Sequence, residues 1–409
     1  ALVALFFVAL ADRGPRAYAT LAALAGGAAL VHPAFAVFAL LPLVGYALVR
    51  TAVARGELRD HLAALVAFAA PVVGALLWLR PIVDQTVSHT PKAQELARAL
   101  AQYRDQLVVS GHAYRLAPEV LGRSGSVAVA ALVCVPLAAL ASRRRWAAYV
   151  LGGALLVLAV SLVPWLFGHF SDAVSLSQSR RFAGFLPFAF AFAGGCWAVA
   201  RFAGLFAPAV ALAAGIALEL AWPGDFGGKT LSHGGPAAAT WIAAFGGAAA
   251  LLVALVRPAG PEERERRRAL VAVAAVCFVL PVAVHGFAHW TAPRRIGAGK
   301  LTPGLVHALR TKVPPRAVVW SDPATSYELN AYAPVSIAVA PPAHVADTKP
   351  NDPYGRMARW RAYHRSGDLA IPRRLGARFV VVDRAVGPPV RGLPKVYADA
   401  RYSLYRLTG

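Results

Sequence analysis

The sequence predicts a polytopic α-helical membrane bundle of about nine to ten spans, the first one partial, followed by a small extracytoplasmic α/β domain. Hydrophobic residues make up 58% of the 409 residues and the mean hydropathy is +0.53, well above the values of soluble domains. Several apolar runs approach the roughly 20 residues that a helix needs to cross a bilayer. After residue 290 the pattern changes to short strands that alternate with helices.

Nine apolar segments are expected to form the spans of residues 1–290. They are 17–31, 34–49, 61–79, 127–142, 147–167, 182–200, 203–222, 238–256 and 269–288. The run at 1–11 is too short to span and lacks the basic start of a signal peptide, so we interpret it as the end of a helix that begins upstream. The chain is therefore expected to be an N-terminally truncated fragment.

Arginine is concentrated in alternate loops, which predicts the orientation because cytoplasmic loops carry an excess of Lys and Arg. The loops expected to be cytoplasmic hold Arg13, Arg16, Arg50, Arg55, Arg59, Arg143, Arg144, Arg145, Arg201, Arg257, Arg264, Arg266, Arg267 and Arg268. The intervening segments, among them 80–126, 168–181, 223–237 and everything after 289, are expected to face outward.

The net charge of +22 does not require a nucleic-acid partner, because 14 of the 42 basic residues lie in the loops just named. The tail 291–409 holds 19 Lys and Arg against 7 Asp and Glu. This excess suits a surface of anionic lipid headgroups or a polyanionic glycan. An Arg-rich compositional background, with 36 Arg to 6 Lys, explains the same excess equally well.

An amphipathic helix is expected near 91–109, in the first long outward segment. Thr90 is suited to cap it and Pro91 to begin it. Leu96, Leu100 and Tyr103 recur at helical spacing, which is typical of a helix that lies in the interface plane. Such a helix either roofs the outer surface of the bundle or packs on the tail domain.

The tail 291–409 is expected to form its own small α/β domain with a mainly parallel sheet. The runs 316–322 and 378–383 are short, β-branched and end in Asp, and 396–407 is typical of a closing strand or hairpin. Helices are expected at 302–310 and at 353–364. Cys134, Cys196 and Cys277 all fall in expected spans, so no disulfide is expected in the tail.

Four stretches together resemble bacterial membrane glycosyltransferases of the GT-C superfamily. They are "HPAFAVFALLPLVGYALVR" at 32–50, "SLSQSRRFAGFLPFAF" at 175–190, "SDPATSYELNAYAP" at 321–334 and "VAPPAHVAD" at 339–347. The resemblance covers nearly the whole chain at the level of architecture. It implies transfer of a sugar from a polyprenyl-phosphate-linked donor to a glycan or lipid acceptor on the outer face of the cell membrane.

The resemblance also implies a catalytic acidic residue in the first outward loop. That loop is expected upstream of Ala1, so the fragment is expected to be inactive on its own. The alternatives are a non-catalytic membrane protein that binds lipid or cell-envelope glycan, and a lipid or glycan transporter. A transporter is disfavoured because Glu219 is essentially the only charged residue within the expected spans.

Arg180 and Arg181 are the first candidate site, because they stand in an outward segment where the cytoplasmic excess of arginine does not explain them. Guanidinium groups bind phosphate in bidentate fashion, and the N-terminus of the span 182–200 adds a partial positive charge. We expect the pair to hold the donor phosphate, with Ser177 and Gln178 as hydrogen-bonding partners of the donor. The alternative is an anchor to lipid headgroups.

His32 and the loop 340–356 are the second and third candidates. His32 stands at the Pro-broken junction of two helices and would orient an acceptor or a phosphate, or else form a polar turn. In the loop, His344, Asp347 and Asp352 would contact an acceptor glycan at the strand ends. The alternative is an ordinary surface loop.

Other motif patterns are incomplete. "WPGDFGGKT" at 222–230 has Pro223 where a phosphate-binding loop needs glycine, and "HGFAH" at 285–289 has Gly286 where a zinc protease needs Glu. No cofactor is evident and no metal ligands are assigned, so a divalent ion is unsupported by any motif.

Overall fold

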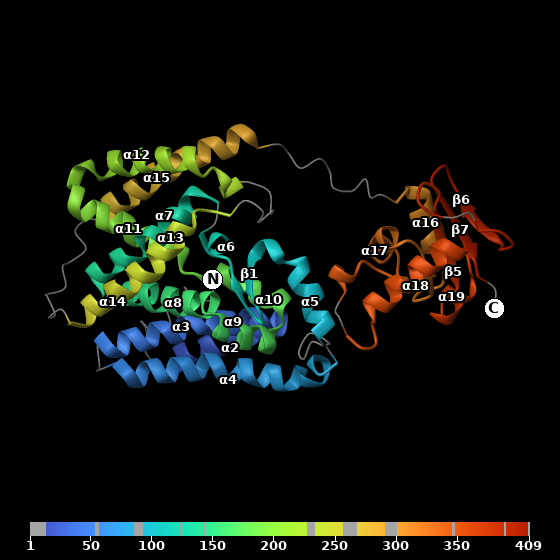
Figure 1. The fold of residues 1–409 in the computed structure, drawn as a ribbon, viewed down its shortest axis with the longest axis horizontal. Coiled ribbons are helices and arrows are strands. Elements are labelled where there is room, and N and C mark those ends of the chain that lie inside the picture. Colours follow the sequence, from blue (N-terminus) through green and yellow to red (C-terminus); the bar gives the residue numbers. More distant parts are fainter. Residues whose placement is uncertain are drawn as a thin grey trace. The chain divides into compact units, whose positions relative to one another are not determined.

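The computed structural model describes residues 14–53, 57–85, 93–122, 124–142, 144–226, 234–256, 268–290, 301–345, 348–387 and 390–407. The chain forms two compact units (Figure 1). The first, called the helical unit, comprises 1–81 and 89–290. The second, called the C-terminal unit, comprises 82–88 and 291–409.

Apolar helices make up the helical unit, as the hydropathy pattern predicts. They are α2 (Pro15–Val31), α3 (Pro33–Val53), α4 (Leu58–Val83), α7 (Ser126–Cys134), α8 (Arg145–Leu162), α9 (Pro164–Val174), α11 (Phe188–Ala203), α12 (Ala207–Ala221), α13 (Ala237–Trp241), α14 (Gly247–Val256) and α15 (Arg268–His289). In the described part of the chain, six helical segments are long and apolar enough to cross a membrane: 33–53, 58–82, 145–162, 176–221, 237–256 and 268–289. A helical membrane bundle is thus confirmed, and the number of nine to ten spans stays a prediction.

Arg144, which precedes α8, and Arg201, in the last turn of α11, meet at one tryptophan ring. Arg144 and Arg201 both lie over the Trp197 ring, with guanidinium carbons 5.5 and 5.6 Å from its centroid. Arg50, in the last turn of α3, pairs with Glu57 at 2.9 Å. Both arginines are expected on the cytoplasmic side, and this orientation stays a prediction.

Small residues let the helices approach closely. A Cβ placed on Gly45 of α3 would lie 2.2 Å from the carbonyl oxygen of Gly152 in α8, and one on Gly215 of α12 would lie 2.3 Å from that of Phe278 in α15. Glycine at such contacts is typical of helix pairs in membranes, where close backbone packing replaces the hydrophobic effect as the driving force.

The amphipathic segment near 91–109 is shorter as a helix than expected. The helix α5 ends at Gln102 (Ala93–Gln102) and the 3₁₀ turn η3 follows (Arg104–Gln106). A hairpin then pairs β1 (Leu107–Ser110) with β2 (Ala113–Leu116), because a β-branched run meets Gly111 in the left-handed region. Leu96, Leu100 and Tyr103 pack against the main core of the helical unit, so α5 roofs the bundle.

Segment 168–181 is helical, although we expected a loop. Pro164 begins α9, and α10 (Leu176–Ser179) and the 3₁₀ helix η5 (Arg180–Phe185) follow without an extended stretch. The next long helix, α11, begins only at Phe188 after Pro187. Arg180 and Arg181 therefore open a 3₁₀ helix, and the N-terminus of α11 is more than a turn beyond them.

A five-stranded mixed sheet forms the middle of the C-terminal unit, in the order β4-β3-β5-β7-β6. Its strands are β3 (Val318–Trp320), β4 (Ser336–Ile337), β5 (Phe379–Asp383), β6 (Lys395–Ala398) and β7 (Tyr402–Arg406). The pairs β3–β4 and β3–β5 are parallel, whereas β5–β7 and β6–β7 are antiparallel. The parallel half and the closing hairpin match the expected strands, but the sheet is not mainly parallel.

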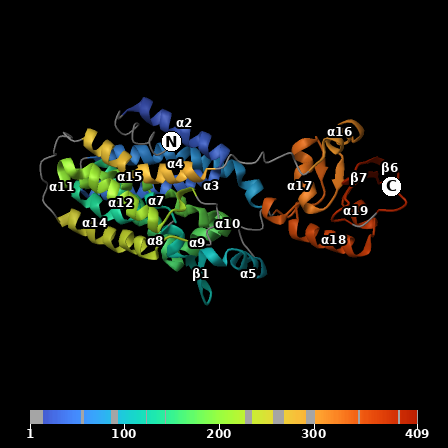
Figure 2. The same ribbon diagram turned by 90° about the horizontal axis from the view of Figure 1, so that it is seen from above.

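Helices cover both faces of this sheet (Figure 2). They are α16 (Pro303–Lys312), α17 (Pro323–Tyr332), α18 (Pro353–Ser366) and α19 (Ala370–Arg374). Val319 and Val381 face a core shared with α16 and α17, and Trp320 and Val380 face one shared with α18 and α19. Alternation along each strand thus builds two apolar layers.

Candidate phosphate-binding site

Arg180 contacts two residues of the segment that follows α5. Its guanidinium carbon lies 4.2 Å from the centroid of the Tyr103 ring, and Nη1 donates to Gln106 Oε1 at 2.9 Å. The Tyr103 hydroxyl donates to Ser177 Oγ at 3.4 Å. A guanidinium over an aromatic face is stabilised by the ring quadrupole. Tyr103 and Gln106 therefore fix the position of Arg180 without neutralising its charge.

Two polar atoms at this site lack partners. Arg180 Nε and Gln178 Oε1 are buried, and no group in the described structure hydrogen-bonds to either of them. No described carboxylate forms an ion pair with Arg180. Because a buried polar atom without a partner costs free energy, these two atoms make the segment a candidate for binding a polar ligand.

Backbone strain lies immediately before the site. Ser175, between α9 and α10, has φ 77° and ψ 149° and is buried. This region is nearly restricted to glycine, and such strain costs about 1–3 kcal/mol per residue and is concentrated at functional sites. The strained Ser175 separates α9 from α10, and η5 follows α10 directly.

Phenylalanine side chains of α3, α9 and η5 pack together, and we call them the phenylalanine cluster: Phe35, Phe38, Phe170, Phe182 and Phe185. The rings of Phe170 and Phe182 are 4.9 Å apart, and Phe35 meets Phe185 edge to face at 5.5 Å. These aromatic contacts connect the start of α3 with η5. The cluster therefore joins the arginine segment to the junction of α2 and α3, with Phe38 and Phe182 fully buried and Phe35 exposed.

His32 lies beside the same cluster. It breaks the chain between α2 and α3, as the His-Pro pair predicts, and its ring stacks on Phe35 at 3.8 Å. Its Nδ1 atom is buried and makes no hydrogen bond in the described part of the chain. The structure thus brings His32 to the phenylalanine cluster that also contains Phe182 and Phe185, two and five residues beyond Arg180.

Arg181 and Ser177 lie differently from Arg180. The Arg181 side chain is exposed, and Ser177 is half-buried with only the Tyr103 contact among described residues. Successive residues of a 3₁₀ helix point about a third of a turn apart. Arg180 and Arg181 therefore do not converge on one ligand from the same side.

The predicted acceptor loop does not form a cluster in the described residues. Asp352 caps α18 by accepting from Gly355 N–H at 3.1 Å, and it pairs with Arg359 at 3.1 Å. His344 is exposed and lies against Tyr327, with ring centroids 4.7 Å apart. Asp347 lies outside the described residues. Asp352 is thus engaged in local structure.

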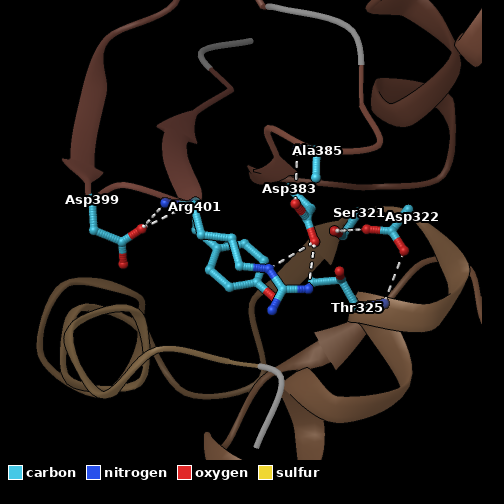
Figure 3. A network of polar contacts seen from close by, with 8 residues as sticks. Ser321, Asp322, Thr325, Asp383, Ala385, Asp399 and Arg401 are labelled. Atoms are coloured by element: carbon cyan, nitrogen blue, oxygen red, sulfur yellow. Dashed lines mark hydrogen bonds and ion pairs between the residues drawn. The ribbon is translucent and has the colours of Figure 1, made fainter.

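Two aspartates end the parallel strands of the C-terminal unit (Figure 3). Asp322 accepts from Thr325 N–H at 2.9 Å and caps α17. Asp383, only 4% exposed, accepts from Ala385 N–H and from Arg401 Nη2, each at 3.0 Å. The hydrogen bond with Asp383 raises the pKa of Arg401. Asp322 and Asp383 line a pocket together with Ser321 and Gly387, but both carboxyl groups are engaged in local structure. We therefore place the candidate site at Arg180.

The described residues contain no group of three His, Cys, Asp or Glu side chains arranged to hold a metal ion. The comparisons with known proteins identify no relative: no family model, no curated protein and no solved structure matches the chain.

Proposed function

We propose that the chain is part of a membrane glycosyltransferase that takes a sugar from a polyprenyl-phosphate-linked donor, and that Arg180 holds the donor phosphate. The observation that carries this proposal is a half-buried guanidinium with an open Nε atom and no described carboxylate partner. It stands two residues before Phe182 of the phenylalanine cluster, whose member Phe35 is exposed. A phosphate joined to a hydrocarbon chain matches both features.

Phosphate fits the open atoms of Arg180. Gln106 occupies Nη1, so Nε and Nη2 form the edge of the guanidinium that remains for a bidentate contact with two phosphate oxygens. Gln178 Oε1 accepts hydrogen bonds only, so it suits a sugar hydroxyl better than a phosphate oxygen. The exposed ring of Phe35 then faces the first apolar units of the carrier.

In this proposal the C-terminal unit lies on the extracytoplasmic side of the cell membrane. Its excess of basic residues favours an acidic glycan or anionic lipids near the acceptor. The catalytic acid remains unassigned, and His32 is proposed to orient the acceptor or the phosphate because its Nδ1 atom is open beside Phe35.

A headgroup anchor is the second candidate, favoured by the exposure of Arg181. In that case ordinary anionic phospholipid would bind Arg180 as tightly as the polyprenyl phosphate does, and the site would not select a sugar donor. The two candidates share the phosphate group and differ in the lipid that carries it.

Binding of a polyprenyl phosphate to the protein in lipid nanodiscs distinguishes the donor site from the headgroup anchor. We expect Arg180→Gln to weaken binding of a short-chain polyprenyl phosphate by about 10- to 100-fold, because a charge-assisted hydrogen bond contributes about 1.5–3 kcal/mol. Arg181→Gln, the matched control, should change it less than threefold. An excess of phosphatidylglycerol should not compete.

Unchanged affinity in Arg180→Gln would contradict a phosphate role for this residue. Equal competition by phosphatidylglycerol would favour the headgroup anchor over a donor site.

A further inference from the structure

A crevice lies at the carboxyl ends of the parallel strands of the C-terminal unit. Strands β4 and β5 lie on opposite sides of β3, and both pair with it in parallel. The chain runs from β3 to β4 through α17 and from β4 to β5 through α18 and α19, and α17 packs on the face opposite to α18 and α19. Open α/β sheets bind their ligands outside the strand ends at such a reversal of direction.

A pocket occupies this crevice, between the strand ends and α18. It is lined by residues at the ends of β3 and β5 and by Trp360, Tyr363 and His364 of α18. It contains about 300 Å³ of space, open solvent at its mouth included, which is the lower end of the range for small-molecule sites. His364 is exposed and Trp360 is half-buried, so the α18 side of the pocket reaches the surface.

One hydrogen-bond donor that lines the pocket has no partner. Trp320 is only 1% exposed, and its Nε1–H makes no hydrogen bond within the described part of the chain. Its ring packs edge to face against Tyr363, with centroids 5.3 Å apart. An indole nitrogen donates only, and a buried donor without an acceptor costs free energy. An acceptor atom of a ligand would remove this cost.

Asp322 supplies an acceptor at the same strand end (Figure 3). Its Oδ1 atom is used by the cap of α17, whereas Oδ2 meets the Ser321 hydroxyl at 3.4 Å, a long hydrogen bond. A carboxylate oxygen accepts more than one hydrogen bond, so Oδ2 can also accept from a ligand. Asp383 differs, because Ala385 N–H and Arg401 engage both of its oxygens.

Aromatic side chains form the α18 wall of the pocket. The rings of Trp360 and His364 stack, with centroids 5.2 Å apart and planes inclined by 23°. An aromatic wall suits a ligand with an apolar face, and a few polar groups then fix the orientation of the ligand. A sugar ring combines these properties, because its C–H bonds form an apolar face and its hydroxyls both donate and accept.

Charged ligands fit the pocket less well. Asp322 and Asp383 both line it, so a phosphate or carboxylate group would meet charges of its own sign. A metal ion would not use the indole N–H, and the described residues contain no group of three side chains arranged to hold one.

We propose that this pocket binds an uncharged sugar ring. One ring hydroxyl accepts from Trp320 Nε1, another donates to Asp322 Oδ2, and the apolar face of the ring lies against Trp360. The site goes beyond the proposed function, because a sugar binds here whether or not Arg180 holds a phosphate.

Saturation-transfer NMR of the full chain in nanodiscs tests the binding. The probes are the methyl pyranosides of glucose, galactose, mannose and N-acetylglucosamine, and empty nanodiscs give the background. We expect at least one glycoside to bind with a Kd on the order of 1 mM and to receive most saturation at its ring C–H protons. Arg180→Gln should bind it equally well, so failure of the donor-phosphate site would not affect this result.

Two variants test the location of the site. Trp320→Phe removes the open N–H and keeps an aromatic ring, and Asp322→Asn removes the charge while keeping a residue that caps helices equally well. Each should weaken binding by about tenfold. Asp368→Asn is the matched control and should change binding less than twofold, because this exposed carboxyl group also accepts from a backbone N–H, at 2.8 Å, but does not line the pocket.

Absence of saturation transfer to all four glycosides would overturn the proposal. So would binding that Asp322→Asn and Trp320→Phe both leave unchanged, because the sugar would then bind elsewhere. If Trp320→Phe disturbs the core, Asp322→Asn alone decides the location, since it keeps the cap of α17.

Discussion

At the scale of single residues, the site around Arg180 depends on a few atoms in uncommon states. Ser175 holds a positive φ in front of it, and Nε of Arg180 and Nδ1 of His32 are buried without described partners. None of these states stabilises the fold, because each costs free energy that the surrounding packing must offset. Their gathering around one aromatic cluster is the reason to regard the region as functional.

Ser175→Gly tests the strain. Glycine adopts φ 77° without a steric cost, so we expect the free energy of unfolding to be unchanged or higher by up to about 1 kcal/mol. Ser179→Gly, a change within the helical α10, should lower it by about 1 kcal/mol. Thermal unfolding in detergent measures both, and equal losses in the two variants would show that Ser175 is unstrained.

At the scale of elements, close glycine contacts set the packing of the bundle. Gly45 and Gly152 bring the backbones of α3 and α8 together, and α3 also contributes Phe35 and Phe38 to the phenylalanine cluster. The position of this cluster therefore depends on the α3–α8 contact. A side chain inserted there would move α3 away from η5.

Gly45→Ala is expected to lower the free energy of unfolding by roughly 1–3 kcal/mol, because overpacking forces the backbones apart. Gly27→Ala in α2, where no atom lies within 4 Å of an added Cβ, should instead raise stability by about 0.5–1 kcal/mol through helix propensity. Thermal unfolding scans distinguish the two, and a neutral Gly45→Ala would refute the close contact.

The sequence predicts the features that depend on residues close together in the chain, and it does not predict contacts between distant segments. Hydropathy locates the apolar helices because each span is a local property of about 20 residues, and Asp322 is predictable as a cap because its partner is three residues away. The contact of Tyr103 with Arg180 and that of Glu219 with His285 join distant segments. Glu219 and His285 each stand out in the sequence, but only helix packing shows that they meet.

Mixed composition explains the two segments in which the predicted secondary structure was wrong. Segment 168–181 contains enough polar residues to suggest a loop, yet Pro164 begins a helix and tertiary contacts keep the chain helical through η5. In 91–109, the β-branched residues before Gly111 favour a strand over the helical pattern of the preceding residues.

At the scale of the whole molecule, a helical unit for the membrane is combined with a C-terminal unit that has two cores of its own. In the latter, Asp399 connects the β6–β7 hairpin with Thr302, the cap of α16. It also accepts from Tyr397 Oη at 2.7 Å and from Tyr402 N–H at 2.6 Å. Partial burial would raise the pKa of Asp399, but these hydrogen bonds lower it to about 2.

The stability of the C-terminal unit should therefore depend on acid. Because the folded pKa of Asp399 lies below its ordinary value of 3.8, its contribution is present above about pH 4 and is lost as pH falls toward about 2. Asp399→Asn should destabilise the unit at pH 7 and have little effect at pH 2. Hydrogen exchange across 301–407 measures this, and an equal effect at both pH values would contradict it.

The proposed binding of a lipid-linked donor phosphate to Arg180 is tested by an experimental structure of the protein in nanodiscs with a short-chain polyprenyl phosphate. We expect phosphate density within hydrogen-bonding distance of Arg180 Nε, with the carrier chain against Phe35. Phosphate density elsewhere, with Nε still open or occupied by a protein carboxylate, would contradict it.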